Sequence, residues 1–391
     1  MKKFLALTLA LVMSLSLVAC GSKNEEPKTD DTNGTQVEEP TEGAYKIAMI
    51  TDYGDITDQS FNQTTYEACK AFAEDNSIEF NYFKPAGDNT ADRVAMIEKA
   101  VDEGYNVIVM PGYAFGGAIV EAAPEFPDVK FIALDVSAGD LGDGFEVPDN
   151  LYCAVYQEEL CGYMAGYAAV KMGYTKLGFL GGMAVPAVVR YGYGFVQGVD
   201  AAAAEMGLTD VTLNYVYGGQ FFGDADITAV MDTWYQSGTE VVFACGGGIY
   251  TSAVDAAKKA DAKVIGVDVD QAGVIANYAE TEGMTITSAM KGLYPTTYDT
   301  LSDVILNDNW SKYAGQIATL GLVSADDPEA NYVQIPMGDG TQWCDTFTQD
   351  DYKAMVKAMY DGELTVSNDI TKSPADFATC IAVEDQGAIK G

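Results

Sequence analysis

The chain has 391 residues, of which 48% are hydrophobic. It contains 22 Lys and Arg residues and 58 Asp and Glu residues, which gives a formal net charge of -36. Its length exceeds the usual size of a single core, so two domains are expected. The charge would repel phosphate backbones, which excludes nucleic acid as an expected partner, and the absence of His removes the commonest general base and the commonest zinc ligand.

The first 44 residues indicate export and tethering rather than a folded domain. MKKFLALTLALVMSLSLVAC joins two lysines to an apolar stretch that ends in small residues, the pattern of a secretory signal. Its last four residues resemble a bacterial lipobox, in which Cys20 is lipidated and becomes the mature N-terminus; the alternative is an ordinary signal with a coincidental Cys. Residues 21–44 are too polar to bury a core. We therefore predict a lipoprotein signal peptide at 1–20, a disordered tether at 21–44, and a lipid anchor at the outer face of the cell membrane.

Beyond the tether, short apolar runs alternate with longer amphipathic stretches, the pattern of a parallel sheet covered by helices. This pattern occurs twice, because KIAMITD, YNVIVMPGY and VKFIALDVSAG in the first half correspond to KLGFLGG, TEVVFACGGG and AKVIGVDVDQAG in the second. The spacing repeats as well, since 28 positions separate Val107 from Asp135 and 27 separate Val241 from Asp268. Two similar α/β lobes are predicted, the N-terminal one from 45–165 and 287–318 and the C-terminal one from 166–286 and 319–391.

Asp135 and Asp268 end equivalent strands of the two repeats. In parallel α/β sheets, ligands bind outside the carboxyl ends of the strands, so two facing lobes would form a cleft lined by these ends. An ionised carboxylate at the end of an apolar strand is costly unless it meets a partner or solvent. We interpret both residues as cleft residues; the alternative is that each caps the turn that follows it.

The chain after Asp268 predicts further crossings between the lobes. MTITSAMKGLYPTTYDTLSDVI reads as a strand followed by a helix, QIATLGL and YVQIP read as short strands, and TQDDYKAMVKAMYDG has the apolar spacing of a helix. So long a tail predicts that the chain passes from lobe to lobe more than once.

Six cysteines lie beyond Cys20, and none shows the paired spacing of a metal site or a redox motif. Most have apolar neighbours, which favours buried free thiols, although export leaves one disulfide as the alternative.

One stretch is typical of a known family. TDYGDITDQSFNQTTYEA resembles the Thr-Asp-x-Gly-x-x-x-Asp-x-Ser-Phe-Asn-Gln motif of the basic membrane protein family of bacterial solute-binding lipoproteins, a group that includes a purine nucleoside receptor. EVVFACGGG, VIGVDVDQ and TSAMK follow in the order of that family's later motifs, and YQEELCGYMAGYAA resembles its inter-lobe segment. The resemblance covers roughly residues 45–325. It implies a type I periplasmic-binding-protein fold with two Rossmann-like lobes that serves an ABC importer for nucleosides.

The same motif supplies the candidate base-binding residues. Phe61 either belongs to the apolar stripe of its helix or lies at the cleft mouth, where its ring would offer a flat face to a planar ligand. Asn62 carries a donor and an acceptor, which suits the edge of a purine. The resemblance implies the second role for Phe61, stacking on the base, and a hydrogen bond from Asn62. Asp58 of the same motif completes this part of the candidate site.

Ribose is best held by ionised carboxylates, because their hydrogen bonds to hydroxyl groups are short and strong. The resemblance implies that Asp268 binds the sugar, that Lys291 reaches the same sugar, and that Asp135 lies near the base. A Lys near Asp268 would also offset the charge of that carboxylate in a closed cleft. The alternative for Lys291 is a solvated lysine at a helix start.

A second aromatic residue is expected to complete the stack from the other lobe, and the candidates are Phe243, Phe222 and Tyr191. Gly246, Gly247 and Gly248 would let the backbone approach the sugar. They do not form a phosphate loop, because neither the Walker spacing nor a complete GxGxxG is present.

Three functions fit these residues. The first is a monomeric, lipid-anchored receptor that closes its lobes on a nucleoside and delivers it to the permease and ATPase subunits of an ABC importer, without a cofactor, a metal or catalysis. The resemblance implies that the nucleoside is a purine nucleoside. The second is a secreted nucleoside hydrolase that uses Asp135, Asp268 and Asp270, which the missing His disfavours. The third is a two-lobe sensor for another small ligand, such as a sugar.

Overall fold

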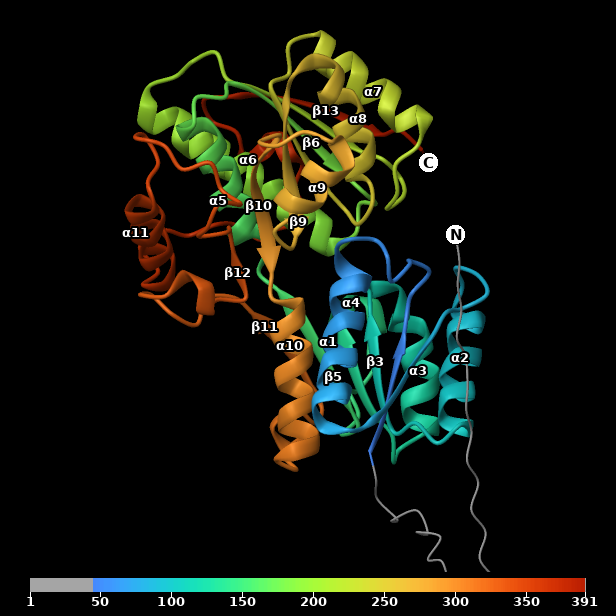
Figure 1. The fold of residues 1–391 in the computed structure, drawn as a ribbon. Helices are drawn as coiled ribbons and strands as arrows, with labels where there is room; N and C mark the ends of the chain where they lie inside the picture. Colours follow the sequence, from blue (N-terminus) through green and yellow to red (C-terminus); the bar gives the residue numbers. More distant parts are fainter. Residues whose placement is uncertain (1–44, 391) are drawn as a thin grey trace, which may run out of the picture. The chain divides into compact units, whose positions relative to one another are not determined.

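Two sheets organise the part of the chain that the structure, a computed structural model, describes, which is residues 45–390 (Figure 1). Residues 45–391 form one compact unit. The predicted signal peptide, Cys20 and the predicted tether lie outside the described residues. The described residues include no helix long and apolar enough to cross a bilayer.

The first sheet has six strands in the order β11-β5-β4-β3-β1-β2, and all neighbours are parallel. Its strands are β1 (Lys46–Ile50), β2 (Glu79–Phe83), β3 (Val107–Pro111), β4 (Lys130–Leu134), β5 (Leu151–Tyr156) and β11 (Gln316–Leu320). The central strands are apolar on both faces because helices cover both. One face packs on α1 (Phe61–Asn76) and α10 (Leu293–Leu301), and the other packs on α2 (Thr90–Asp102) and α3 (Gly116–Glu125).

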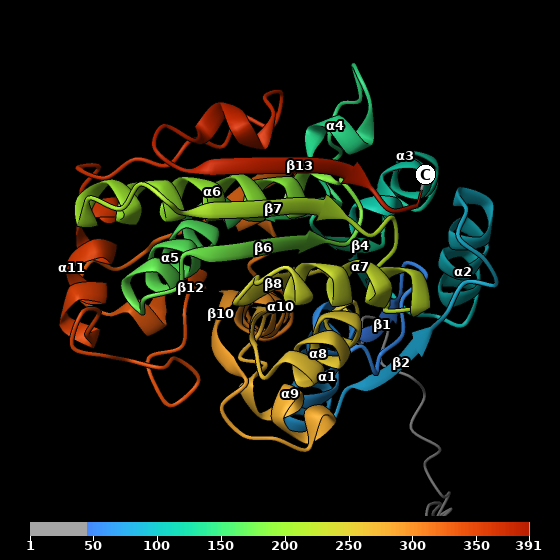
Figure 2. The same ribbon diagram turned by 90° about the horizontal axis from the view of Figure 1, so that it is seen from above.

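The second sheet has seven strands in the order β12-β10-β9-β8-β6-β7-β13, and β12 alone runs antiparallel to its neighbour. Its strands are β6 (Lys176–Gly181), β7 (Thr212–Tyr217), β8 (Val241–Cys245), β9 (Lys263–Asp268), β10 (Thr285–Lys291), β12 (Val333–Gln334) and β13 (Ala382–Ala388). Figure 2 shows β13 beside β7 at one edge.

Helices also cover both faces of the second sheet. The paired helices α5 (Glu158–Lys171) and α6 (Pro186–Met206) cover one face, and α7 (Ala225–Gln236), α8 (Tyr250–Ala260) and α9 (Ala272–Ala279) cover the other. The remaining helical segments are α4 (Ala138–Leu141), α11 (Gln349–Tyr360), η1 (Tyr113–Phe115), η2 (Ser302–Leu306), η3 (Trp310–Lys312), η4 (Pro328–Ala330) and η5 (Pro374–Phe377).

The predicted repeat is confirmed by the strand order. The run β5-β4-β3-β1-β2 in the first sheet matches β10-β9-β8-β6-β7 in the second, position for position in chain order. The strands predicted from QIATLGL and YVQIP are β11 and β12, and the helix predicted near the C-terminus is α11. We call the first sheet with its helices the first lobe, and the second sheet with its helices the second lobe.

The lobe boundaries differ from the prediction at three places. β10 pairs with β9, so residues 287–291 belong to the second lobe rather than the first. α5 packs along α6, so residues 158–165 also belong to the second lobe. β11 runs on through Leu320, which keeps 319–320 in the first lobe. The apolar pattern predicts a strand or a helix, but it does not predict which lobe that element joins.

The chain crosses between the lobes three times, after β5, after β10 and after β11. The crossing segments are hydrogen-bonded to one another. Gln157 N–H donates to the Leu320 carbonyl at 2.9 Å, Gly292 N–H donates to the Tyr332 carbonyl at 2.7 Å, and Tyr332 N–H donates to the Gly321 carbonyl at 3.0 Å. The expectation of more than one crossing is therefore confirmed.

The six cysteines beyond Cys20 are free thiols in the structure. Cys69, Cys153, Cys161 and Cys245 are buried, while Cys344 and Cys380 are partly buried. This agrees with the expectation of buried thiols for four of the six.

Candidate functional site

A cavity of about 350 Å³ lies where the carboxyl ends of the two sheets meet. It is lined from the first lobe mainly by residues that follow β1, β2, β3 and β4, and from the second lobe by residues that follow β6, β7 and β8 and by the last residues of β9 and β10. The volume is within the range of roughly 300–1,000 Å³ that is usual for small-molecule sites. The cleft predicted from the strand ends is therefore present.

The loop after β1 is built around Asp58. Its carboxylate accepts the backbone N–H groups of Ser60 at 3.0 Å, Asn62 at 2.9 Å and Gln63 at 3.0 Å, and the Asn62 side-chain Nδ2 at 3.2 Å. Burial raises the pKa of Asp58, while these backbone N–H groups lower it. Asp58 lines the cavity, as predicted, and its contacts show that it caps the first turn of α1 and holds the Asn62 amide.

Phe61 is the first residue of α1 and lines the cavity. Its ring is partly buried against the core, and the Lys291 Nζ lies 4.8 Å from the ring centroid. Asn62 is buried and also lines the cavity. The ring thus meets the core at one side and the cavity at the other, so both interpretations of Phe61 describe part of its position.

Lys291, at the end of β10, is surrounded by carboxylates. Its Nζ lies 2.5 Å from Asp135 Oδ2, 3.5 Å from Glu158 Oε1 and 3.8 Å from Asp268 Oδ1, and its side chain is 3% exposed. Burial lowers the pKa of Lys291, but the three carboxylates outweigh burial and raise it overall. Lys291 is therefore a buried cation and not the solvated lysine of the alternative interpretation.

Asp268 is held by both lobes. Ser60 Oγ of the first lobe donates to its Oδ2 at 2.6 Å, and Tyr191 OH of the second lobe donates to its Oδ1 at 3.3 Å. Burial raises the pKa of Asp268, whereas Lys291 and the Ser60 hydrogen bond lower it. The Ser60 contact crosses the cleft, so Asp268 does more than cap its own turn.

Asp135 and Asp268 share an unusual backbone conformation. Their φ angles are 59° and 65°, in the left-handed region that favours glycine. Non-glycine residues in this region cluster at functional sites, because the surrounding structure must hold them there. The two strand ends thus correspond in backbone as well as in sequence.

Glu158 and Arg190 extend the charge cluster, and the sequence did not single them out. Arg190 Nε donates to Glu158 Oε2 at 2.7 Å, and the Glu158 side chain is fully buried. Arg190 lines the cavity. Glu158 does not line it, but its carboxylate contacts both Arg190 and Lys291. The only signal for this pair was the position of Glu158 in the predicted inter-lobe segment, since its partner lies 32 positions later.

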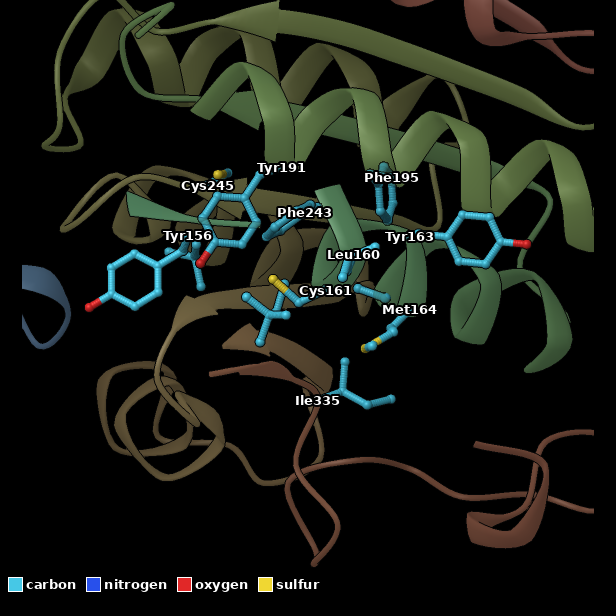
Figure 3. Packing of buried hydrophobic residues seen from close by; sticks show 14 of the residues in the cluster. Tyr156, Leu160, Cys161, Tyr163, Met164, Tyr191, Phe195, Phe243, Cys245 and Ile335 are labelled. Carbon is cyan, nitrogen blue, oxygen red and sulfur yellow. The ribbon is translucent and has the colours of Figure 1, made fainter. Parts of the chain in front are cut away.

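Phe243, one of the three candidates for the second stacking residue, does not line the cavity. Figure 3 shows Phe243 in the core of the second lobe among Tyr191, Phe195 and Cys161. Its ring is fully buried, 5.4 Å from the Phe179 ring and 5.3 Å from the Phe195 ring. Phe243 lies two residues before the end of β8, where α5 and α6 still cover the sheet.

Three other aromatic residues of the second lobe line the cavity. Tyr191 is 2% exposed and directs its hydroxyl to Asp268, and Phe222 is 59% exposed. Phe221, which the sequence analysis missed, lies with its ring centroid 6.4 Å from that of Tyr53, across the cleft. Tyr53 of the first lobe, also missed, donates its hydroxyl to Met183 Sδ at 3.4 Å.

The glycines after β8 make room for Phe221. A Cβ on Gly246 would lie 2.8 Å from Phe221 Cδ1 and 3.1 Å from Gly182 Cα, and the φ angles of Gly246 and Gly247 are 149° and 49°. Gly248 N–H donates to the Phe221 carbonyl at 2.9 Å. All three glycines line the cavity, and a side chain at Gly246 would displace the Phe221 ring.

The cavity differs from a metal centre. The described residues contain no group of three or more His, Cys, Asp or Glu side chains arranged to hold a metal ion. The carboxylates of Asp135, Asp268 and Glu158 converge on the Lys291 ammonium instead. The arrangement can bind and orient a small polar molecule with an aromatic part.

Comparisons with known proteins agree with this geometry. Residues 45–325 match the family model described as "ABC transporter substrate-binding protein PnrA-like". The chain is 29% identical over 308 residues to a "CD4+ T-cell-stimulating antigen" of Listeria innocua, covering 74% of this chain and 80% of that protein. It is 27% identical over 284 residues to the "ABC transporter nucleoside-binding protein BmpA" of Lactococcus lactis, covering 69% of this chain and 75% of that protein.

A solved structure of an ABC transporter solute-binding protein from Aeropyrum pernix superposes with a TM-score of 0.64 at 21% sequence identity. The superposition covers 85% of this chain and 90% of that one. The expected type I two-lobe fold of solute-binding proteins is thereby confirmed.

Proposed function

The chain belongs to the Bmp family of ABC transporter substrate-binding proteins, and from this premise we propose that its cavity captures a nucleoside, with a purine as the preferred base, for delivery to an ABC importer. The permease and ATPase subunits of that importer are the proposed protein partners, and the proposed receptor acts as a monomer.

One observation carries this proposal: an aromatic face and a cluster of charged groups line the same cavity. Phe61 offers a ring on which a base can stack, and such stacking is worth about 1–3 kcal/mol per base. Asp135 and Asp268, with Lys291 between them, offer charged groups to vicinal hydroxyls. The name of the Lactococcus lactis relative, a nucleoside-binding protein, supports the same ligand class.

The ligand would favour closure of the lobes because its contacts come from both. Closure is stabilised only by interactions that exist in the closed state and not in the open one. Direct contacts already join the lobes, since Ser60 bonds to Asp268 and Gln271 Nε2 donates to the Gln59 carbonyl at 3.2 Å. A nucleoside held by Phe61 on one side and Asp268 on the other would add to these contacts.

We propose Phe221 in place of Phe243 as the aromatic residue that faces the base from the second lobe. Its ring lines the cavity and lies across from Tyr53, whereas Phe243 is sealed in the core. Gly246 and Gly247 support this role by leaving space for the Phe221 ring. Phe222, which is far more exposed, would shield the entrance.

Isothermal titration calorimetry of the purified protein with guanosine, inosine, adenosine, uridine and ribose tests the proposal. Purine nucleosides are expected to bind and to remain intact by chromatography. Binding of ribose with no affinity for any nucleoside would instead favour a sugar receptor. Release of free base would favour a hydrolase.

We further propose that Cys20 carries a lipid that holds the protein at the extracytoplasmic face of the cell membrane. The support is the lipobox-like sequence that ends at Cys20, followed by the polar residues 21–44. Cys20→Ser in the full chain is expected to move the protein from the membrane fraction to the medium. Unchanged membrane retention in this variant would contradict the lipid anchor.

A further inference from the structure

Two buried atoms of the cavity wall lack a hydrogen-bond partner, and both are acceptors. Among the described residues that line the cavity, only Asn62 Oδ1 and Asp135 Oδ1 are buried side-chain polar atoms without a partner. An unpaired buried acceptor costs free energy, so a bound ligand gains affinity by donating to it. These two atoms can therefore be paired only by N–H or O–H donors of the ligand.

The polarity of the Asn62 amide follows from Asp58. An ionised carboxylate can only accept hydrogen bonds, and Asp58 already receives N–H groups from Ser60, Asn62 and Gln63. The side-chain atom of Asn62 that lies 3.2 Å from Asp58 Oδ2 must accordingly be the Nδ2 donor, because an oxygen there would be repelled. Asn62 is left with Oδ1 as the atom it offers to other partners.

Gly54 holds the amide from the opposite side. A Cβ on Gly54 would lie 2.3 Å from Asn62 Nδ2, so the NH₂ group is enclosed between this glycine and Asp58. The Asn62 side chain therefore has little room to turn over when a ligand with the opposite hydrogen-bonding pattern arrives. Asp58 acts here as a positioning residue.

We propose that Asp58 fixes Asn62 as a hydrogen-bond acceptor, so that the cavity selects nucleosides whose base carries an N–H donor on its edge. This inference rests on the proposed nucleoside function and names the specificity of that site. Adenosine, inosine and guanosine carry such a donor. Purine riboside and 6-methoxypurine riboside have the same sugar and ring system without a donor on the base.

Binding of these nucleosides to the unmodified protein tests the inference directly. Adenosine is expected to bind about 10- to 100-fold more tightly than 6-methoxypurine riboside, because a donor-free base leaves Asn62 Oδ1 unpaired. Equal affinities for adenosine, purine riboside and 6-methoxypurine riboside would overturn the inference and leave the nucleoside function intact. No measurable binding of any nucleoside would overturn both.

The variant Asp58→Asn tests the positioning role. An amide at position 58 can donate to Asn62 and let it turn over, so the adenosine preference is expected to fall several-fold. If both nucleosides weaken by the same factor, Asp58 has only a structural role and the proposal fails. Asp92→Asn changes a partly exposed carboxylate in the first turn of α2, away from the cavity, and serves as the matched control.

Loss of the Asp58 cap also threatens the fold of α1, so a second variant keeps the test decisive. Asn62→Ala retains Asp58 and removes the acceptor, and its ratio of adenosine to 6-methoxypurine riboside affinity is expected to approach one. A ratio that stays at the value of the unmodified protein would overturn the proposal. Circular dichroism of each variant establishes that α1 is folded.

Discussion

Asp135 and Asp268 occupy matching places in the two lobes and meet different surroundings. Both follow or end the fourth strand of their repeat, and both adopt a left-handed backbone conformation. Each oxygen of Asp268 has a hydrogen-bond partner, Ser60 or Tyr191, whereas Asp135 contacts Lys291 through one oxygen and leaves the other without a partner. Duplication thus preserved the backbone of the site, while its chemistry became asymmetric.

Each aspartate is also held by the opposite lobe. Ser60 of the first lobe bonds to Asp268 of the second, and Lys291 of the second lobe pairs with Asp135 of the first. Separation of the lobes would break both contacts and expose two carboxylates and one ammonium group to water. The two strand-end carboxylates therefore hold the lobes together, in addition to their proposed contacts with the ligand.

Removal of the shared cation is expected to have the largest effect. Lys291→Met leaves Asp135, Asp268 and Glu158 close together without their ammonium partner, and loss of one member of a buried ion pair costs about 3–5 kcal/mol. We expect a loss of this size in the free energy of unfolding, measured by urea denaturation, and loss of nucleoside binding. Lys312→Met, which removes an exposed ion pair with Asp303, is the control and is expected to cost under about 1 kcal/mol.

The two aspartates are expected to respond unequally to neutralisation. Asp135→Asn removes the shortest ion pair of Lys291 and is expected to lower the free energy of unfolding by about 2–3 kcal/mol. Asp268→Asn is expected to cost under about 1 kcal/mol, because burial already disfavours its charge and its oxygen lies 3.8 Å from Lys291 Nζ. If urea denaturation gave the two variants equal losses in the free energy of unfolding, or a larger loss for Asp268→Asn, the unequal contacts of the two aspartates would not make them unequal in stability.

Phe61 and Phe243 allow a comparison of an aromatic ring from each lobe, because the Phe61 ring lines the cavity and the Phe243 ring does not. Phe61→Ala is expected to weaken nucleoside binding by about 1–3 kcal/mol in calorimetry, the value of one base stacked on an aromatic ring. Phe243→Leu changes the buried ring of the second lobe and is expected to lower stability rather than affinity. Unchanged affinity in Phe61→Ala would make this ring a core residue only.

Glu159 lies outside the cavity, and its expected effect depends on pH. Burial raises the pKa of Glu159 from 4.5 to about 7, and its Oε2 has no hydrogen-bond partner. The folded state therefore binds a proton that the unfolded chain has lost between about pH 4.5 and 7, so the free energy of unfolding falls as the pH rises through this window.

Glu159→Gln removes this titration. We expect the variant to be more stable than the unmodified protein by roughly 3 kcal/mol at pH 8 and about equally stable at pH 4, measured by urea denaturation at both values. A variant whose stability keeps the same dependence on pH between 4.5 and 7 would show that Glu159 is not the group responsible.

The sequence predicted the framework of the site but not its closing contacts. Local apolar runs and their repetition predicted the strands, the two similar lobes and the strand-end positions of Asp135 and Asp268, because these depend on neighbours in the chain. The choice of Phe243 failed because position on a strand does not tell whether a helix covers that position. Phe221 was missed because its position depends on the fold of the loops after β7 and β8.

The buried ion pair of Glu158 and Arg190 was missed for a different reason. Charges that neutralise one another in the interior leave no periodic pattern, and their partners are known only once α5 and α6 are packed together. The predicted lobe boundary at β10 was wrong for a similar reason. The sequence of β10 suits a strand of either sheet, and only its pairing with β9 shows that it belongs to the second lobe.

The three crossing segments have a mechanical consequence. Because Gln157, Gly292 and Gly321 are tied to their neighbours by backbone hydrogen bonds, the connections form a three-stranded ribbon rather than three independent threads. We therefore expect the three segments to bend together as one hinge, which would return Ser60 to Asp268 each time the lobes close.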